Sequence, residues 1–377
     1  SPALQDRLYL NDGRGNFRKA PAGSLPAETV SGSRAAAADF DGDGAIDLFI
    51  GGRVVPWRYG LTPRSTLLRN DGRGHFTDVT AKFAPGLAQV GMVTDALWRD
   101  VTGDGRPDLV VVGEWMPITI FRNTGHSLER MEVPGLARSN GWWNRIVAGD
   151  FDGDGRVDFV VGNLGLNTRL QASEREPVTM YVKDFLKNGF VEQIIASYNG
   201  GSSYPFVLRD DLIGSLPYLR PRFASYHDYA GKSMSDIFSK DDLAGAEVRT
   251  AYTFATSLVH NDGNGKFTVV PLPTEAQLAP VYGILARDFN GDGKLDLLLA
   301  GNFNGVKPEI GRMAASYGLY LEGTGKGTFT PVRAAESGFF VPGESRDIER
   351  LGTPKGELYV VTRNDARALV FRPAGKR

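Results

Sequence analysis

DFDGDGRVD, residues 150–158, places carboxylates at positions 1, 3, 5 and 9 and glycines at positions 4 and 6. Carboxylates this close repel one another, and a pair about 4 Å apart costs roughly 1 kcal/mol in water and about 4 kcal/mol at an effective dielectric constant of about 20. An all-oxygen cage suits a hard cation of the calcium type. Position 9 closes the loop, where a helix-flanked calcium loop uses Glu at position 12, and the apolar run Phe159 to Val161 follows. The stretch therefore predicts a calcium loop between two strands.

The pattern occurs three more times, as DFDGDGAID (39–47), DVTGDGRPD (100–108) and DFNGDGKLD (288–296), each followed by an apolar run that meets a glycine. We expect Ca²⁺ to be bound by side chains at positions 1, 3, 5 and 9 and by the backbone carbonyl at position 7. The predicted ligands are Asp39, Asp41, Asp43, Ala45, Asp47, Asp100, Thr102, Asp104, Arg106, Asp108, Asp150, Asp152, Asp154, Arg156, Asp158, Asp288, Asn290, Asp292, Lys294 and Asp296. A fifth copy, Asp184 to Glu192, has Leu186 at position 3, so we expect about four Ca²⁺ sites and an empty or weak fifth loop.

A second repeat alternates with the acidic loops. LYLNDGRGNF ends at Phe17, LLRNDGRGHF at Phe76, LVHNDGNGKF at Phe267 and LYLEGTGKGTF at Phe329. An apolar run, then Asn-Asp-Gly or a similar turn, then an aromatic residue is typical of a β-hairpin. One repeat is thus four antiparallel strands that cannot bury their own faces, which predicts an all-β chain of stacked blades, a β-propeller.

The acidic loop and the N-D-G-x-G-x-F hairpin together resemble the FG-GAP/VCBS repeats of the integrin α-subunit propeller. The chain is most similar to secreted bacterial VCBS-repeat proteins that resemble cartilage acidic protein, through GEWMP (113–117), GWWN (141–144) and GNLGLN (162–167). The resemblance implies that the acidic loops join the first two strands of each blade on one face. It also implies that partners bind the opposite face.

The whole chain, 1–377, is expected to form a single calcium-binding propeller, with blades that start near Arg34, Gly91, Trp143, Val178 and Val281. Residues 1–20 supply only the outer hairpin of a closing or truncated blade, while the C-terminus offers strands at 346–351, 357–361 and 368–371. The count is seven blades, with six as the alternative, because the N-terminal hairpin duplicates a strand that the C-terminus already has.

Residues 199–255 break the repeat and are expected to be an aromatic-rich, partly helical insertion in one blade. Ser233 or Ser235 is a candidate helix cap. The aromatic side chains either pack on the propeller as a lid or form a recognition surface, since aromatic residues are enriched where proteins bind partners.

Composition excludes several classes of protein. The net charge of −1 argues against nucleic-acid binding, which needs a basic face. The absence of cysteine removes thiol catalysis and disulfides. No apolar run is long enough to predict a membrane span. Acidic loops of extracellular modules bind calcium weakly, at about 10⁻⁴ to 10⁻³ M, so we expect an exported protein that is periplasmic, at the cell surface or extracellular in a bacterium.

A ligand site is expected at the turns that follow each second strand, on the face opposite the acidic loops. Repeat symmetry gathers there Arg53, Trp57, Glu114, Trp115, Trp142, Trp143, Asn163, Asn167, Asn302 and Asn304. This set suits a carbohydrate or a peptide. The alternative is that the asparagines only cap turns and that the tryptophans wedge between blades.

Catalytic constellations are scarce. His75 and His260 occupy hairpin-turn positions, which indicates surface turns. Tyr226, His227, Arg220 and Arg222 are clustered in sequence and offer the proton transfer and cationic support that a polysaccharide lyase needs.

The sequence favours a non-enzymatic, calcium-stabilised propeller that binds a protein or a glycan. One alternative is a carbohydrate-active lyase or hydrolase that uses the insertion. The other is a structural propeller module of a longer surface protein.

Overall fold

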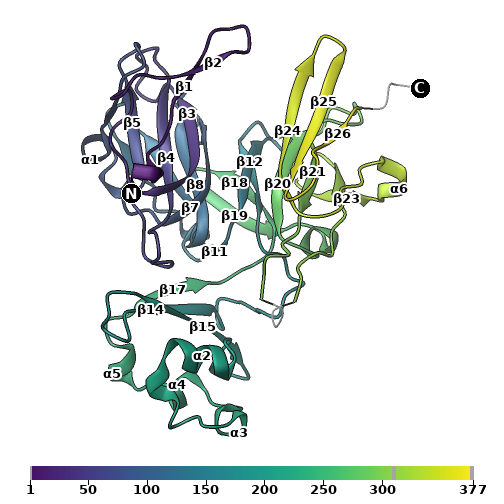
Figure 1. Ribbon diagram of the computed structural model, residues 1–377. Coiled ribbons are helices and arrows are strands. Elements are labelled where there is room, and N and C mark those ends of the chain that lie inside the picture. The colour runs from purple at the N-terminus through teal and green to yellow at the C-terminus, as the bar shows by residue number, and fades with distance from the viewer. Residues whose placement is uncertain (1, 308–310, 374–377) are drawn as a thin grey trace.

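The computed structural model describes residues 2–307 and 311–373, and its regular structure is mostly β (Figure 1). Each acidic loop lies between the first two strands of an antiparallel sheet, as the repeat predicted. The first sheet has the order β3 (Ser31–Ala38), β4 (Asp47–Val54), β5 (Thr66–Asn70), β6 (Phe76–Asp78). The second has β7 (Met92–Arg99), β8 (Asp108–Met116), β9 (Thr119–Asn123) and β10 (Leu128–Arg130), and β11 (Gly141–Trp142) also pairs with β8.

Two further sheets repeat this arrangement. The third is β12 (Arg145–Gly149), β13 (Asp158–Gly162), β18 (Ser257–Gly263) and β19 (Lys266–Pro271). The fourth is β20 (Val281–Arg287), β21 (Asp296–Gly301), β22 (Leu319–Gly323) and β23 (Phe329–Val332). In both sheets the third and fourth strands are the predicted hairpin.

The third sheet corrects the expected order of blades. Phe159 on β13 pairs with Val259 on β18, so residues 163–256 are an insertion between the second and third strands of one sheet. Val178 therefore does not start the next sheet of the series. The inserted segment is also longer than the expected 199–255. The sequence could not predict this length, because nothing in it indicates that the hairpin ending at Phe267 belongs to the same sheet as the loop at Asp150.

The insertion holds a sheet of its own with a different topology. Its order is β16 (Ser202–Pro205), β15 (Glu192–Asn199), β14 (Val178–Lys183), β17 (Glu247–Ala251), with the decayed acidic loop between β14 and β15. Short helices cover it: α2 (Arg209–Ser215), η4 (Pro217–Leu219), α3 (Tyr226–Tyr229), α4 (Met234–Ile237) and α5 (Lys240–Leu243). Ser233 caps α4, as one of the two candidates. Figure 1 shows this body below the other sheets.

The two ends of the chain do not share a sheet. The hairpin of β1 (Tyr9–Asn11) and β2 (Phe17–Lys19) pairs with none of the other described strands. The C-terminal sheet has the order β24 (Ser345–Thr353), β25 (Gly356–Arg363), β26 (Leu369–Phe371), close to the expected strands. The remaining short helices are η1 (Pro2–Leu4), α1 (Thr80–Phe83), η2 (Pro85–Leu87), η3 (Pro134–Leu136), η5 (Thr274–Gln277) and α6 (Ala334–Ser337). Closure into a ring of six or seven blades stays a prediction.

The first strands of five sheets lie side by side in the order β3, β7, β12, β20, β24, which we call the first-strand row. Separate apolar cores fill the spaces between successive sheets. Phe49, Leu67 and Trp98 pack between the first two sheets, and Phe159 lies between the second and the third. Because every sheet buries its faces against its neighbours, the row is held by packing along its whole length.

A chain of buried charges runs along the row. Five positions before the first aspartate of its acidic loop, β3 carries Arg34, β7 carries Asp95, β12 carries Arg145 and β20 carries Gly283. The corresponding residue of β24 is Asp347. Arg34 Nε lies 2.8 Å from Asp95, and Arg145 lies 3.5 Å from Asp95 and 2.8 Å from Asp347. Asp95 is 1% exposed. Burial raises the pKa of Asp95, while the two arginines oppose that shift.

We predict that Asp95→Ala lowers the free energy of unfolding by about 3 kcal/mol, because it strands the buried Ile146 amide and removes one partner of Arg145, whose side chain is only 12% exposed. Glu349→Ala is the control: it also removes a partner of Arg145, at 3.0 Å, but its side chain is 63% exposed. Loss of such an exposed pair costs about 1 kcal/mol or less. Urea unfolding measures both, and similar small losses in the two variants would contradict a structural role for the buried chain of charges.

Candidate functional site

The acidic loops are shaped by the aspartate at position 1. Asp150 Oδ1 accepts hydrogen bonds from the amides of Gly153 at 2.8 Å and Asp154 at 3.2 Å, and Oδ2 accepts from Gly155 at 3.0 Å. Gly153 and Gly155 have φ values of 80° and 82°, a region that glycine enters without steric cost. Asp39, Asp100 and Asp288 make the same three bonds.

The decayed loop keeps this geometry. Asp184 accepts from the amides of Asn188 at 2.9 Å and Gly189 at 2.8 Å, and Lys187 takes the left-handed conformation at position 4 with φ of 53°. The loop shape is therefore retained where an oxygen at position 3 is missing.

The aspartate at position 9 ties each loop to the hairpin of the same sheet. Asp158 is fully buried; its Oδ1 accepts from the Asn261 amide at 2.8 Å and its Oδ2 from the Phe151 amide at 3.2 Å. The equivalent residues Asp47, Asp108 and Asp296 are also fully buried and make the same two bonds. Burial raises the pKa of Asp158, and the two amide bonds act in the opposite direction. Position 9, predicted only as a metal ligand, is also a structural acceptor.

Two loops bring three carboxylates together. One oxygen each from Asp39, Asp41 and Asp43, and likewise from Asp150, Asp152 and Asp154, lie within 4.8 Å of one another. Calcium binds oxygen at about 2.3–2.6 Å, so ligands of one ion are separated by up to about 5 Å. Both clusters therefore fit a calcium-sized cation, and the acidic groups could hold a metal ion.

A side chain from the third strand faces each loop. Arg69 lies 2.6 Å from Asp41 and 2.9 Å from Asp43, and Arg122 lies 3.5 Å from Asp104. In the fourth loop the equivalent residue is acidic: Glu322 accepts a bond from Asn290 at 2.7 Å. The first and second loops thus face a third-strand arginine that partly neutralises their acids, and any bound cation would share those acids with it.

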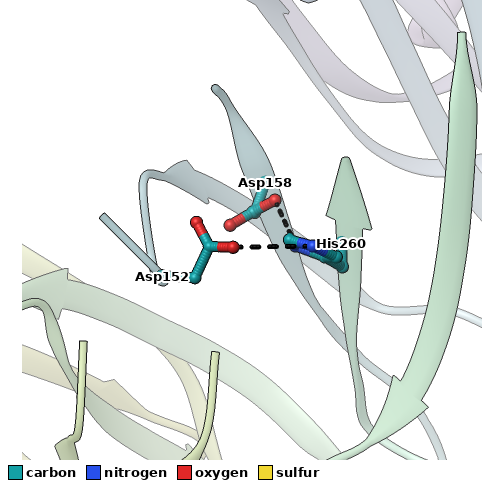
Figure 2. A group of neighbouring side chains, drawn as sticks. All are labelled: Asp152, Asp158 and His260. Carbon is teal, nitrogen blue, oxygen red and sulfur yellow. Dashed lines mark hydrogen bonds and ion pairs between the residues drawn. The ribbon is translucent and has the colours of Figure 1, made fainter. Parts of the chain in front are cut away.

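His260 holds the equivalent place beside the third loop, which corrects its interpretation as a surface turn residue. It lies on β18, and Figure 2 shows its ring between Asp152 of the loop and Asp158 at the start of β13. Its Nδ1 lies 3.1 Å from Asp158 and its Nε2 lies 3.5 Å from Asp152. His75, by contrast, is exposed in a hairpin turn.

A cavity of about 680 Å³ lies at the other end of the first-strand row. Its floor is formed by the residues that directly precede Arg34, Asp95, Arg145, Gly283 and Asp347 in the five first strands: Ser33, Thr94, Asn144, Tyr282 and Arg346. Its other walls come from the insertion and from the connection between β21 and β22, through side chains such as Leu170, Ile195, Phe206, Phe303 and Lys307. We call this space the row-end cavity.

One wall of the row-end cavity is a connected polar group. Arg53 Nη2 lies 2.6 Å from Glu114 Oε1, and the Tyr59 hydroxyl donates to Glu114 Oε2 at 2.5 Å. Trp115 Nε1 donates to the Tyr59 oxygen at 3.0 Å. Burial and the charge of Glu114 raise the pKa of Tyr59, so its hydroxyl stays protonated as a donor. The group is therefore held in one arrangement.

Part of the floor is built around Arg346. Its guanidinium lies 4.5 Å from the ring centroid of Tyr282 and 5.9 Å from that of Phe303. Its Nη1 donates to the carbonyls of Asn302 at 3.1 Å and Ser345 at 3.0 Å. Burial raises the pKa of Tyr282 to about 12. Stacking and hydrogen bonds together fix this cation in place.

The predicted ligand residues separate into different environments. Arg53, Glu114 and Trp142 line the row-end cavity. Trp115 is buried behind it, and its ring lies 5.0 Å from that of Trp142. Trp143 is fully buried between the second and third sheets. This matches the alternative prediction that the tryptophans pack between blades. Trp57 is 90% exposed and lies outside the cavity lining.

The predicted asparagines serve the backbone. Asn163 is buried and accepts from the Trp142 amide at 3.0 Å, and Asn302 is buried and donates to Ser316 at 2.6 Å and to Gly343 at 2.8 Å. Asn167 donates to Leu278 at 3.0 Å, and the Asn304 amide donates to Glu344. The hydrogen bonds of these four asparagines hold backbone segments around the cavity, and none of the four residues belongs to the described lining.

The four catalytic candidates of the insertion do not meet at the cavity. Tyr226 donates to Asp210, Arg222 donates to the carbonyls of Ile237 and Asp236, and Arg220 and His227 are exposed. None of the four belongs to the cavity lining among the described residues.

Sequence reasoning missed Tyr59, Tyr282, Arg346, Phe206 and Phe303. Tyr282 could have been predicted from the repeat. It lies six residues before the first aspartate of an acidic loop, as do Ser33, Thr94 and Asn144. The others come from the insertion, from long connections or from a sheet without an acidic loop, so no repeat position marks them.

Comparison with known proteins identifies the repeat. A profile of FG-GAP-like repeats matches residues 3–50 and 100–161, so the chain carries repeats of this type. No curated protein matches the chain. None of the described helices is long and apolar enough to cross a membrane.

Solved structures show only distant likeness. An Agrocybe aegerita lectin that recognises non-reducing terminal N-acetylglucosamine is 18% identical, with 89% of this chain and 76% of the lectin covered and a TM-score of 0.34. The exotype rhamnogalacturonan lyase YesX is 14% identical, with 97% and 62% covered and a TM-score of 0.36. The V. cholerae biofilm matrix protein Bap1 is 12% identical, with 90% and 77% covered and a TM-score of 0.28. Likeness this low transfers neither a ligand nor an activity.

We predict that Asp296→Ala destabilises the protein by about 3 kcal/mol or more in calcium-free buffer. The variant strands the buried amide of Gly323 and the partly buried amide of Phe289, and a buried donor without a partner costs about 1–3 kcal/mol. Asp292→Ala in the same loop is the control, because it removes an exposed pair with Lys294 and should cost about 1 kcal/mol or less. Equal losses on chemical unfolding would show that position 9 has no separate structural role.

Proposed function

We propose that this FG-GAP-like repeat protein is a non-enzymatic, calcium-stabilised propeller that binds a glycan in the row-end cavity. The observation that carries the proposal is the lining of that cavity. Aromatic rings of Trp142, Phe206, Tyr282 and Phe303 lie around a small number of fixed polar groups. Binding sites for small molecules are mostly apolar clefts with a few placed polar groups, and this cavity has that composition.

A saccharide uses both kinds of surface. The C–H face of a sugar ring packs on aromatic side chains, and its hydroxyls donate and accept hydrogen bonds. Two buried donors in the lining, Arg53 Nη1 and Trp142 Nε1, have no hydrogen-bond partner among the described residues. An unpaired buried donor costs about 1–3 kcal/mol, so a small side-chain shift that lets a ligand oxygen accept from either donor would be stabilising.

The size of the cavity argues for a small ligand over a folded protein. About 680 Å³ lies within the range of about 300–1,000 Å³ that ligand pockets occupy. A stable protein interface instead buries about 800 Å² on each partner, over a broad surface. A short oligosaccharide or one residue of an extended peptide fits the cavity, and the aromatic lining favours the oligosaccharide.

Calcium would stabilise the other end of the first-strand row. It would be held by the acidic loops, with the two three-carboxylate clusters at Asp39 and Asp150 as the strongest candidates. The ion supplies positive charge that offsets carboxylate repulsion. A cation that binds only the folded chain stabilises it by about 2.7 kcal/mol per site at a hundredfold excess over the dissociation constant. Filling weak loops needs millimolar calcium, which supports an exported location.

We predict that Trp142→Ala weakens oligosaccharide binding at least about tenfold, because it removes an aromatic wall of the cavity. Trp57→Ala is the matched control, since Trp57 is exposed and outside the lining. Trp142 also packs on Phe254, with ring centroids 5.1 Å apart, so the milder Phe206→Ala tests the same wall if Trp142→Ala does not fold. Binding is measured by calorimetry against a panel of neutral and acidic oligosaccharides. Equal affinity of the wild type and both cavity variants would refute the site.

We predict that a calcium chelator lowers the melting temperature, and that Asp152→Ala reduces the number of bound luminescent lanthanide ions by one. The aspartate contributes to the carboxylate cluster of the third loop. Leu186→Ala in the decayed loop is the control and should leave the count unchanged. An unaltered melting curve in chelator would remove the case for structural calcium.

A further inference from the structure

We infer that the row-end cavity selects a saccharide that carries a carboxylate, such as a uronate-containing oligosaccharide. The inference rests on the proposed function and names the class of glycan. It comes from an imbalance between cationic and anionic groups and between donors and acceptors in the lining.

The charges of the lining are unequal. Among the described residues of the lining there are three cationic side chains, Arg53, Lys307 and Arg346, and one carboxylate, Glu114. That carboxylate is already engaged, since Arg53 and the Tyr59 hydroxyl bond its two oxygens. The other two cations have anionic partners that do not line the cavity: Asp211 lies 2.8 Å from Lys307, and Glu344 lies 3.3 Å from Arg346. Each of the three cations thus has one carboxylate beside it, but of these carboxylates only Glu114 lines the cavity, so the described lining carries more cationic than anionic side chains.

The serine and threonine hydroxyls of the floor are committed to the backbone. Ser33 Oγ donates to the Val93 carbonyl at 2.7 Å, and Thr94 Oγ1 donates to the Trp143 carbonyl at 2.7 Å. These bonds link neighbouring sheets. The donors left without a partner are then on Arg53 and Trp142, on the same wall. An ionised carboxylate only accepts hydrogen bonds, whereas a sugar hydroxyl both donates and accepts. A ligand with a carboxylate therefore complements these unpaired donors better than a neutral sugar does.

Arg53 and Arg346 both line the row-end cavity, and the Arg346 guanidinium lies 4.5 Å from the ring centroid of Tyr282. Arg346 is held by two carbonyls and by the rings beside it, so little side-chain entropy is lost when it binds an anion. Hydrogen bonds between a guanidinium and a carboxylate are charge-assisted and about twice as strong as neutral ones.

The test compares uronate trisaccharides with their carboxyl-reduced counterparts by calorimetry at fixed free calcium. We expect the wild type to bind the acidic form at least about tenfold more tightly, and Arg346→Gln to lose that preference while it still binds the reduced form. Arg138→Gln removes an exposed arginine outside the cavity and should keep the preference. Arg53→Gln gives a second reading if Arg346→Gln does not fold.

The outcomes separate the two proposals. Equal affinity for the acidic and reduced forms overturns the carboxylate inference and leaves glycan binding intact. No binding of either form overturns the proposed function itself. Competition by a peptide with an acidic side chain, in the absence of any sugar binding, would identify the ligand as a peptide carboxylate and contradict both.

Discussion

A buried aspartate that accepts two backbone amides holds each repeat together. In Asp158 one oxygen closes the acidic loop and the other anchors the third strand, and the same pair of bonds recurs at Asp47, Asp108 and Asp296. Burial of a carboxylate is costly unless its oxygens are paired. In these four sheets the buried aspartate therefore stabilises the native register of the loop and the hairpin, and the acidic loops are part of the scaffold before any cation is considered.

In the sheets with an acidic loop, the first strand contributes to the structure at three positions along its length. Its C-terminal end enters an acidic loop, its middle carries a buried charge in three of the four acidic-loop sheets, and its start forms the cavity floor. In β7, Asp95 supplies the charge and Thr94 the floor. Because neighbouring first strands lie side by side, the spacing of the loops at one end fixes the spacing of cavity residues at the other. The scaffold thereby positions side chains that no local sequence feature brings together.

The loops and hairpins could be predicted from sequence because their chemistry is local. Glycine at positions that need positive φ, and acidic residues at fixed spacing, define them within nine residues. The insertion could not be placed, since pairing of Phe159 with Val259 joins strands about a hundred residues apart and nothing local records it. The cavity was found only in part. Trp142 and Glu114 follow the repeat, whereas Phe206 reaches the cavity through the inserted sheet and Arg346 through the last sheet.

We propose that calcium and a saccharide bind at opposite ends of the first-strand row, and hydrogen–deuterium exchange tests that separation directly. Protection is compared for the protein with calcium alone, with an acidic oligosaccharide alone, and with both. We predict that calcium protects the loops at 39–47 and 150–158, and that the saccharide protects residues around Trp142, Tyr282 and Arg346, with no overlap. Protection of the acidic loops by the saccharide, or an absence of protection at the cavity, would contradict the account.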